Sequence, residues 1–433
     1  MTKTVGAFVL ALSITTLIAC SGGGGGGGGD NQSPAPVNGA PSFVSPSELA
    51  VTEGSLSTGY TAAATDPDGD PLTFAIAGGA DESLFTIGGT SGVLSFVTAP
   101  DFFLPTDQNI DNVYEVRLSV SDGEGGSASI NVSITVVADP ATGVRYRDPI
   151  FANVTETLNV KFGDGQLDGG GTQELFMDVY VPSGDSETNR AVMIIAHGGG
   201  FIGGNRQQET DTAISFARRG YVAATIDYRL IDGLPSDGDE LSIGALKAVH
   251  DAFAAVRFFR EDALGSNVYG TRPDAIFMGG VSAGGVIAAV AATFDDADTA
   301  TSAALENFRT ANGGTAGNSS SNLSISSEIQ GAMPISGAIL DVNWIDAQSK
   351  PQYAAHDEFD AVVPCRTGAE GSTNTGLIVI GPCDYIPAYD ALSITADLLL
   401  KLGSTGHVSF TEGERELIYT NAGALFLSEV IDP

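Results

Sequence analysis

The sequence is poor in basic residues. Lysine and arginine together number 19 against 53 aspartates and glutamates, which gives the 433-residue chain a formal net charge of −34. A surface of this sign repels the phosphate backbone of nucleic acids and anionic lipid headgroups. The charge therefore argues against binding to DNA, to RNA or, through a basic patch, to a membrane.

Cysteine is scarce as well, with three residues at positions 20, 365 and 383. The sequence offers no metal site built from cysteine. Cys365 and Cys383 lie close together near the C-terminus, and an even pair in an exported chain predicts a disulfide that closes a surface loop. Two free thiols are the alternative.

The chain also lacks an apolar run long enough for a comfortable membrane span. Its longest candidate runs from Val5 to Ile18, after Lys3 and before small residues. That pattern is typical of a cleaved signal peptide. We therefore expect residues 1–19 to be an export signal.

The end of this leader, Leu17-Ile18-Ala19-Cys20, resembles the lipobox of bacterial lipoproteins. The resemblance implies that Cys20 becomes the acylated N-terminus and anchors the protein to a bacterial membrane, at the outer membrane or cell surface. Residues 20–40 follow as a linker, and the glycine run Gly22–Gly29 predicts a flexible tether. An ordinary secreted protein is the alternative.

Residues 41–139 predict an all-β domain of about one hundred residues, because short apolar runs alternate with Gly, Asp and Pro turns. The predicted strands are Leu72–Ala75, Val93–Phe96, Tyr114–Val120 and Ile130–Val137. Such spacing indicates a β-sandwich.

This domain resembles a cadherin-like repeat, an Ig-like sandwich, through Ala40-Pro41-Ser42-Phe43, Val51-Thr52-Glu53-Gly54, Asp66-Pro67-Asp68-Gly69-Asp70 and Tyr114–Gly123. The resemblance implies a calcium site with Glu53, Asp66 and Asp68 as ligands, and binding of a cell-surface or polymer ligand. Calcium prefers such oxygen donors. The chain departs from the family because Phe103 replaces an expected glutamate and only one repeat is present. A solvated turn at Asp66 and Asp68 stays open.

After a linker near Pro140–Gly143, residues 146–433 alternate strands with helices, which predicts a mostly parallel sheet with helices on both faces. The predicted strands are Leu175–Val181, Ala191–Ala196, Val222–Asp227, Ala275–Met278, Gly331–Ile335 and Asp397–Leu402. The predicted helices are Asp211–Arg219, Ile243–Arg260 and Gly284–Phe294, with a final amphipathic helix.

The motif Gly280-Val281-Ser282-Ala283-Gly284 stands between a predicted strand and a predicted helix. Alone it is a weak signal, but a strand–turn–helix setting is the context of a nucleophile elbow. Glycines allow the sharp turn that exposes the serine hydroxyl. We therefore predict that Ser282 is a nucleophile.

A second motif, His197-Gly198-Gly199-Gly200-Phe201, ends another predicted strand. Acyl transfer passes through an oxyanion that needs preorganised N–H donors, and glycines offer backbone N–H groups without steric obstruction. We predict an oxyanion hole formed by Gly198 and Gly199 together with Ala283. A plain loop is the alternative for a glycine run considered alone.

Together these motifs resemble the esterase/lipase branch of the α/β-hydrolases over residues 146–431, with Asp227-Tyr228-Arg229-Leu230 in the expected place. The family order of serine, acid and histidine implies His407, in a Gly-His loop, as the base. Asp360, in Asp360-Ala361-Val362-Val363-Pro364, matches the acid. Asp357 and Glu358 remain competitors for that role.

The other histidines are assigned structural places. His356 stands where the family often has a non-catalytic histidine, His197 braces the oxyanion loop, and His250 is packed or on the surface. Residues Asp295–Asn322 are either a lid or a loop with a short helix near Thr301–Arg309.

These patterns predict a surface-anchored serine carboxylic ester hydrolase that needs no cofactor for catalysis and acts on an unspecified ester through Ser282, Asp360 and His407. A calcium-dependent adhesion protein with a secondary or inactive hydrolase domain is the runner-up. An inactive binding scaffold is the third reading.

Overall fold

The computed structural model describes residues 37–102, 105–137, 143–320 and 322–431. The predicted signal peptide, Cys20 and the glycine tether lie outside the described residues, and so does Phe103. Within the described ranges, no helix has both the length and the apolar character that a membrane crossing requires.

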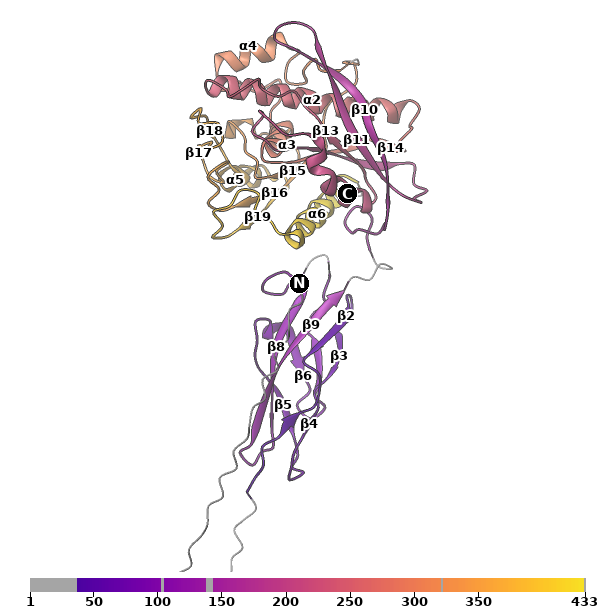
Figure 1. The fold of residues 1–433 in the computed structure, drawn as a ribbon, viewed down its shortest axis with the longest axis vertical. Helices are drawn as coiled ribbons and strands as arrows, with labels where there is room; N and C mark the ends of the chain where they lie inside the picture. The colour runs from indigo at the N-terminus through magenta and orange to yellow at the C-terminus, as the bar shows by residue number, and fades with distance from the viewer. Residues whose placement is uncertain (1–36, 103–104, 138–142, 321, 432–433) are drawn as a thin grey trace, which may run out of the picture.

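Figure 1 shows a body built mainly of strands, formed by the first third of the chain, and a larger body of helices and strands formed by the rest. The first body has strands β1 (Ser42–Phe43), β2 (Glu48–Thr52), β3 (Ser57–Thr61), β4 (Ala64–Thr65), β5 (Thr73–Gly78), β6 (Phe85–Ile87), β7 (Val93–Phe96), β8 (Val113–Ser121) and β9 (Ser127–Val137). One sheet has the order β2-β9-β8-β5 and the other β3-β7-β6, which makes a sandwich.

Alternating side chains build the core of the sandwich. Along β8, Tyr114, Val116, Leu118 and Val120 are buried while the residues between them face outward or are half-buried. This period of two is what a sheet with one covered face requires. The Tyr114 ring meets the Phe96 ring edge-on, with 5.3 Å between their centroids.

The second body contains an eight-stranded sheet with the order β10-β11-β13-β12-β14-β15-β16-β19. Its strands are β10 (Val154–Gln166), β11 (Thr172–Pro182), β12 (Arg190–Ala196), β13 (Val222–Ile226), β14 (Thr271–Val281), β15 (Gly331–Ile335), β16 (Gln352–Asp357) and β19 (Ala396–Lys401). The ladders from β13 to β19 are parallel, whereas β10 and β11 pair antiparallel at one edge.

The central strands are almost entirely apolar because both faces of the sheet are covered. Every residue of β12 and β13 is buried. Continuous apolar runs of this kind are typical of parallel strands between two helical layers. Together with the sandwich, this arrangement confirms the predicted fold class.

Six α-helices accompany the sheet in the described residues. They are α1 (Thr210–Arg218), α2 (Gly238–Leu264), α3 (Ala283–Thr293), α4 (Ala303–Ala311), α5 (Pro382–Leu392) and α6 (Glu412–Phe426). α1 and α6 share one buried apolar cluster, while α2 and α3 share another on the opposite face of the sheet. α2 begins well before the predicted residue 243, because the Asp237 carboxylate caps it by accepting from Glu240 N at 3.0 Å.

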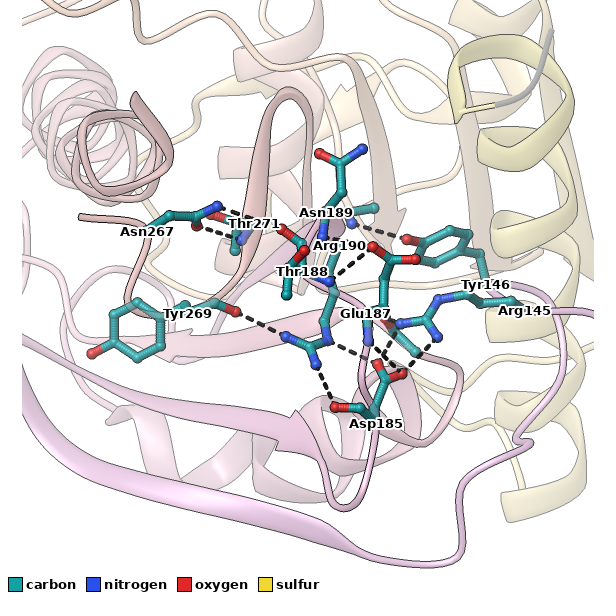
Figure 2. Close-up of polar contacts among 12 residues, drawn as sticks. Arg145, Tyr146, Asp185, Glu187, Thr188, Asn189, Arg190, Asn267, Tyr269 and Thr271 are labelled. Atoms are coloured by element: carbon teal, nitrogen blue, oxygen red, sulfur yellow. Dashed lines mark hydrogen bonds and ion pairs between the residues drawn. The ribbon is translucent and has the colours of Figure 1, made fainter. Parts of the chain in front are cut away.

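The start of this body is tied to the sheet through the Asp185 carboxylate, shown in Figure 2. Arg145 Nη2 donates to Asp185 Oδ2 at 2.6 Å, and Arg190 Nε donates to the same oxygen at 2.8 Å. Burial raises the pKa of Asp185, but these two guanidinium groups outweigh it, so the pKa falls to about 2. The carboxylate is therefore ionised at neutral pH and holds residue 145 beside the beginning of β12.

Candidate active site

Ser282 stands at the turn between β14 and α3, with φ 57° and ψ −116°. A positive φ is costly for a residue with a side chain and marks a backbone held under strain. Its glycine neighbours make the turn possible. A methyl group at Gly284 would lie 2.0 Å from the carbonyl oxygen of Ala196, and one at Gly280 would lie 2.4 Å from the backbone of Gly284.

The structure brings Ser282, His407 and Asp360 into one hydrogen-bonded chain. His407 Nε2 lies 2.8 Å from Ser282 Oγ, and His407 Nδ1 lies 2.7 Å from Asp360 Oδ2. The other oxygen of Asp360 accepts from the amides of Val362 at 2.8 Å and Val363 at 3.1 Å. A neutral imidazole in this position donates from Nδ1 and accepts the serine proton at Nε2.

The two competing acids lie elsewhere. Asp357 accepts from Ser404 Oγ at 2.6 Å, from Ser409 N at 3.0 Å and from Ser409 Oγ. Glu358 accepts from Gly403 N at 2.7 Å. Asp357 thus forms hydrogen bonds with the chain on both sides of His407. Burial raises the pKa of Asp357, but the bonds from Ser404 and Ser409 outweigh it and lower the pKa overall.

His356 is buried directly behind the acid. Its Nε2 lies 2.8 Å from the carbonyl oxygen of Val363 and 3.7 Å from Asp360 Oδ2. Burial lowers the pKa of His356, so the ring is neutral near pH 7 and donates to that carbonyl. It supports the Asp360 loop and does not reach Ser282.

The glycine loop lies across from Ser282. Gly199 has a φ of 121°, and a methyl group there would lie 2.1 Å from the carbonyl oxygen of Gly203. In the described part of the chain, the amides of Gly198, Gly199 and Ala283 donate to no protein acceptor. Free N–H groups beside a nucleophile are what an oxyanion hole requires.

His197 holds this loop in place. Its ring stacks on Tyr228 with 4.2 Å between the centroids, and its Nδ1 lies 2.6 Å from the carbonyl oxygen of Gly198. The Tyr228 hydroxyl donates to the His197 carbonyl at 2.8 Å. His250 is fully buried far from the triad, packed against the Phe308 ring.

An apolar pocket opens at Ser282. Its wall combines side chains from α2, α3 and α4 with Phe294 and Trp344. The Trp344 ring packs at a tilt against Phe294, with 4.2 Å between the ring centroids, and its Nε1 donates to the carbonyl oxygen of Thr299 at 3.0 Å. The sequence did not predict which residues form the pocket wall, because no local signal marks residues that meet only in the folded chain.

The segment 295–322 contributes α4 to this wall through Leu305. The short helix expected near residues 301–309 is present, shifted by two residues. Its Ser302 cap accepts from Leu305 N at 3.1 Å. The segment is therefore part of the pocket.

A disulfide bounds the opposite wall. Cys365 and Cys383 are joined, with 5.3 Å between their Cα atoms. The loop between them carries the two short strands β17 (Gly368–Ala369) and β18 (Ile378–Val379), and Leu377 and Val379 from it line the pocket. The bond closes a loop, as the cysteine spacing predicted, and that loop borders the site.

The predicted calcium ligands are not all neighbours. Asp66 and Asp68 lie together with Asp70, with one carboxylate oxygen from each within 4.8 Å of the others. Glu53 belongs to a different place, where it accepts from Phe102 N at 2.9 Å. The grouping of Glu53 with Asp66 and Asp68 was therefore wrong, because Glu53 follows β2 and binds the main chain at Phe102, whereas the two aspartates follow β4 and cluster with Asp70. Calcium binding stays a prediction.

Comparisons with known proteins agree with this architecture. Residues 177–372 match BD-FAE, an α/β-hydrolase esterase family, and residues 35–135 match the bacterial Ig domain family. The family that fits the sandwich is thus a bacterial Ig domain. The comparison with curated protein sequences gave no match.

Solved esterase structures are similar to this chain. A truncated carbohydrate esterase from gut microbiota is 17% identical, with a TM-score of 0.44 over 64% of this chain and 96% of that one. Propionate-bound esterase 2 of the planctomycete Thermogutta terrifontis is 19% identical, with a TM-score of 0.44 over 64% of this chain and 94% of that one.

Proposed function

We propose, from the premise that this chain carries an α/β-hydrolase esterase domain behind a bacterial Ig-like domain, that it is a serine carboxylic ester hydrolase working through an acyl-enzyme on Ser282. The observation that carries the proposal is the chain of hydrogen bonds from Ser282 through His407 to Asp360. It stands at the mouth of an apolar pocket.

Acylation begins when Ser282 Oγ attacks the ester carbonyl carbon and its proton moves to His407 Nε2. The carbonyl oxygen becomes an oxyanion, which accepts from the amides of Gly198, Gly199 and Ala283. Asp360 stabilises the imidazolium through Nδ1–H. When the tetrahedral intermediate collapses, the bond to the alcohol oxygen breaks and His407 Nε2 gives that oxygen its proton.

Deacylation repeats these steps with water. His407 Nε2 takes a proton from water as its oxygen attacks the acyl carbon, and the second oxyanion uses the same amides. Collapse breaks the bond to Ser282 Oγ, which recovers its proton from His407. The carboxylic acid leaves and the free serine is restored. The two half-reactions balance with one ester and one water as reactants and one alcohol and one carboxylic acid as products.

The position of His407 indicates on which side of Ser282 the alcohol part of the ester binds and on which side the acyl group binds. The group that protonates the leaving alcohol has to reach its oxygen, so the alcohol lies on the side that His407 lines. His407 lines a second, more open pocket that shares Ser282 but does not line the apolar one. The apolar pocket therefore takes the acyl group, and an apolar acyl group fits its wall.

We expect Ala245→Phe to change acyl-chain preference, because Ala245 lines the apolar pocket and a phenyl ring there would fill part of it. The kcat/KM for p-nitrophenyl octanoate should fall at least tenfold, while that for p-nitrophenyl acetate should change less than threefold. Ala303→Phe, at an exposed position of α4, is the matched control. Equal losses for both esters would contradict this placement of the acyl group.

We further propose that the enzyme is exported and anchored to a bacterial membrane by acyl chains on Cys20, which the lipobox-like leader supports. Cys20→Ala is expected to move the protein from the membrane fraction to the soluble fraction of expressing cells. Ser21→Ala should leave it on the membrane. Full membrane retention of Cys20→Ala would contradict the anchor.

A further inference from the structure

A buried carboxyl group that the mechanism does not use lines the open pocket on the alcohol side. Glu209 ends the 3₁₀ helix Arg206–Glu209 and borders the same space as Ser282 and His407. Its neighbours along this pocket are Gln208 and Ser372. Glu209 and Gln208 thus place polar groups in an otherwise largely apolar pocket, on the side of Ser282 where the leaving alcohol lies.

The backbone around Glu209 is fixed. Asn205 caps the helix through a reciprocal pair of bonds with the main chain and side chain of Gln208. Arg206 Nε forms an ion pair with Asp178 at 3.0 Å, and Arg206 also pairs with Asp227. Glu209 is therefore held by a rigid support, which a recognition residue needs.

Only one oxygen of the Glu209 carboxyl is satisfied by the protein. Thr212 Oγ1 donates to Oε2 at 2.8 Å, and the Tyr419 hydroxyl lies 3.1 Å from that same Thr212 oxygen. In the described residues, Oε1 has no hydrogen-bond partner in the protein and no cation lies within ion-pair distance of the carboxyl, although Glu209 is only 7% exposed. Oε1 is not sealed from solvent, so a ligand group in the pocket can take the place of water there.

We infer that Glu209 recognises the alcohol part of the ester, accepting a hydrogen bond at Oε1 from a hydroxyl group that the alcohol carries beyond the ester oxygen. This inference rests on the proposed ester hydrolysis and deepens it. The substrate class is an ester with an apolar acyl group and a hydroxyl-bearing alcohol. A hydroxyl satisfies the free oxygen, whereas an alkyl chain in the same place leaves it without a partner.

The ionisation of Glu209 gives a second readout. The pKa of Glu209 is raised to about 7, because the effect of burial, with a small contribution from Asp211, outweighs the lowering by Thr212 and Arg415. Tyr228 and Tyr419 also face the carboxyl, and both stay neutral in this range because burial raises their pKa values. An ionised acceptor binds a hydroxyl more strongly than a neutral one. Preference for the hydroxyl-bearing ester should therefore rise as pH increases through 7.

The experiment compares two esters with one acyl group, glycerol 1-butyrate and propyl butyrate, by measuring butyrate release. For each protein the result is the ratio of the two kcat/KM values, in which any effect of pH that is common to both esters cancels. Wild type is expected to favour the glycerol ester at least tenfold, mainly through KM, and more strongly at pH 8 than at pH 6. Glu209→Leu is expected to bring the ratio close to one.

Glu209→Gln keeps the shape of the side chain, so it can test the role of the Glu209 carboxyl group if the leucine variant does not fold. It should retain part of the preference but lose its pH dependence, because an amide does not ionise. Glu156→Leu, at an exposed position of β10, should keep the wild-type ratio. The inference is overturned if Glu209→Leu keeps that ratio, or if Glu209→Gln keeps its pH dependence.

Failure of the proposed function looks different. Wild type would then hydrolyse neither butyrate ester and would not react with a fluorophosphonate at Ser282, which overturns both claims. Turnover of both esters with a ratio near one in wild type keeps the hydrolase and removes only the role of Glu209.

Discussion

Asp360→Asn is expected to lower kcat by about 10³- to 10⁴-fold, because the acid of a triad fixes the tautomer of the histidine and stabilises its charged form. An asparagine keeps the volume of the side chain but places an uncharged amide 2.7 Å from His407 Nδ1. Its amide group can donate there, which favours the tautomer whose Nε2 carries the proton. Such a ring cannot accept the proton of Ser282. The measurement is p-nitrophenyl butyrate hydrolysis.

Asp357→Asn is the matched control. Asp357 bonds to Ser404 and Ser409 on either side of the histidine and does not touch its ring. Loosening that loop should cost far less than losing the acid, on the order of tenfold. A loss in Asp357→Asn as large as in Asp360→Asn, with both proteins folded, would contradict the assignment of the acid.

The choice among these acids shows which part of the site could be predicted from the sequence and which part could not. Motif spacing placed Ser282 in an elbow and His407 in the last loop, and both side chains meet in the structure. Residues 357, 358 and 360 are neighbours in the chain, so spacing alone cannot separate them. What separates them is the direction of each side chain at the end of β16, and only the folded chain fixes that direction.

The residues of the pocket wall could not be predicted from the sequence for a different reason. Ala245, Val290, Leu305, Trp344 and Leu377 come from five separate segments and meet only when the sheet, the helices and the disulfide-closed loop are assembled. From its neighbours in the sequence, each of these residues cannot be told apart from an ordinary core residue. The same holds for Glu209, which gives no sign in the sequence that its carboxyl is buried.

The prediction of a mostly parallel sheet was correct, but it missed the antiparallel pairing at one edge of the sheet. The paired strands β10 and β11 form an antiparallel edge, and β10 was not predicted. Most residues in the first half of β10 are exposed, so it lacks the continuous apolar run that identified β12 and β13. An edge strand covered on one face gives a weak periodic signal.

In the sandwich, the predicted strand Tyr114–Val120 is present within β8, but the predicted calcium set is divided. The acidic turn at residues 66–70 keeps its three carboxylates together, and Asp66 Oδ1 already accepts from the amides of Asp68 at 2.9 Å and Asp70 at 3.2 Å. Those bonds are typical of a turn held by its own aspartate. They account for the motif without an ion.

Ser282→Ala is expected to have the largest effect, because it removes the nucleophile itself. Without Oγ no acyl-enzyme forms, and only the oxyanion amides and substrate binding remain to accelerate attack by water. The loss in kcat should reach about 10⁵-fold or more. The substitution removes one oxygen atom at the mouth of a pocket, so the fold should persist, which the near-ultraviolet circular dichroism of the variant can verify.

The most direct test is therefore hydrolysis of p-nitrophenyl butyrate by a protein that starts at residue 37, measured beside Ser282→Ala and beside Ser266→Ala, an exposed serine outside the site. We predict turnover by the wild type and by Ser266→Ala, and none above background by Ser282→Ala. Turnover that survives in Ser282→Ala would contradict a serine nucleophile at this position. Absence of turnover in the folded wild type would instead favour a binding scaffold built on a hydrolase fold.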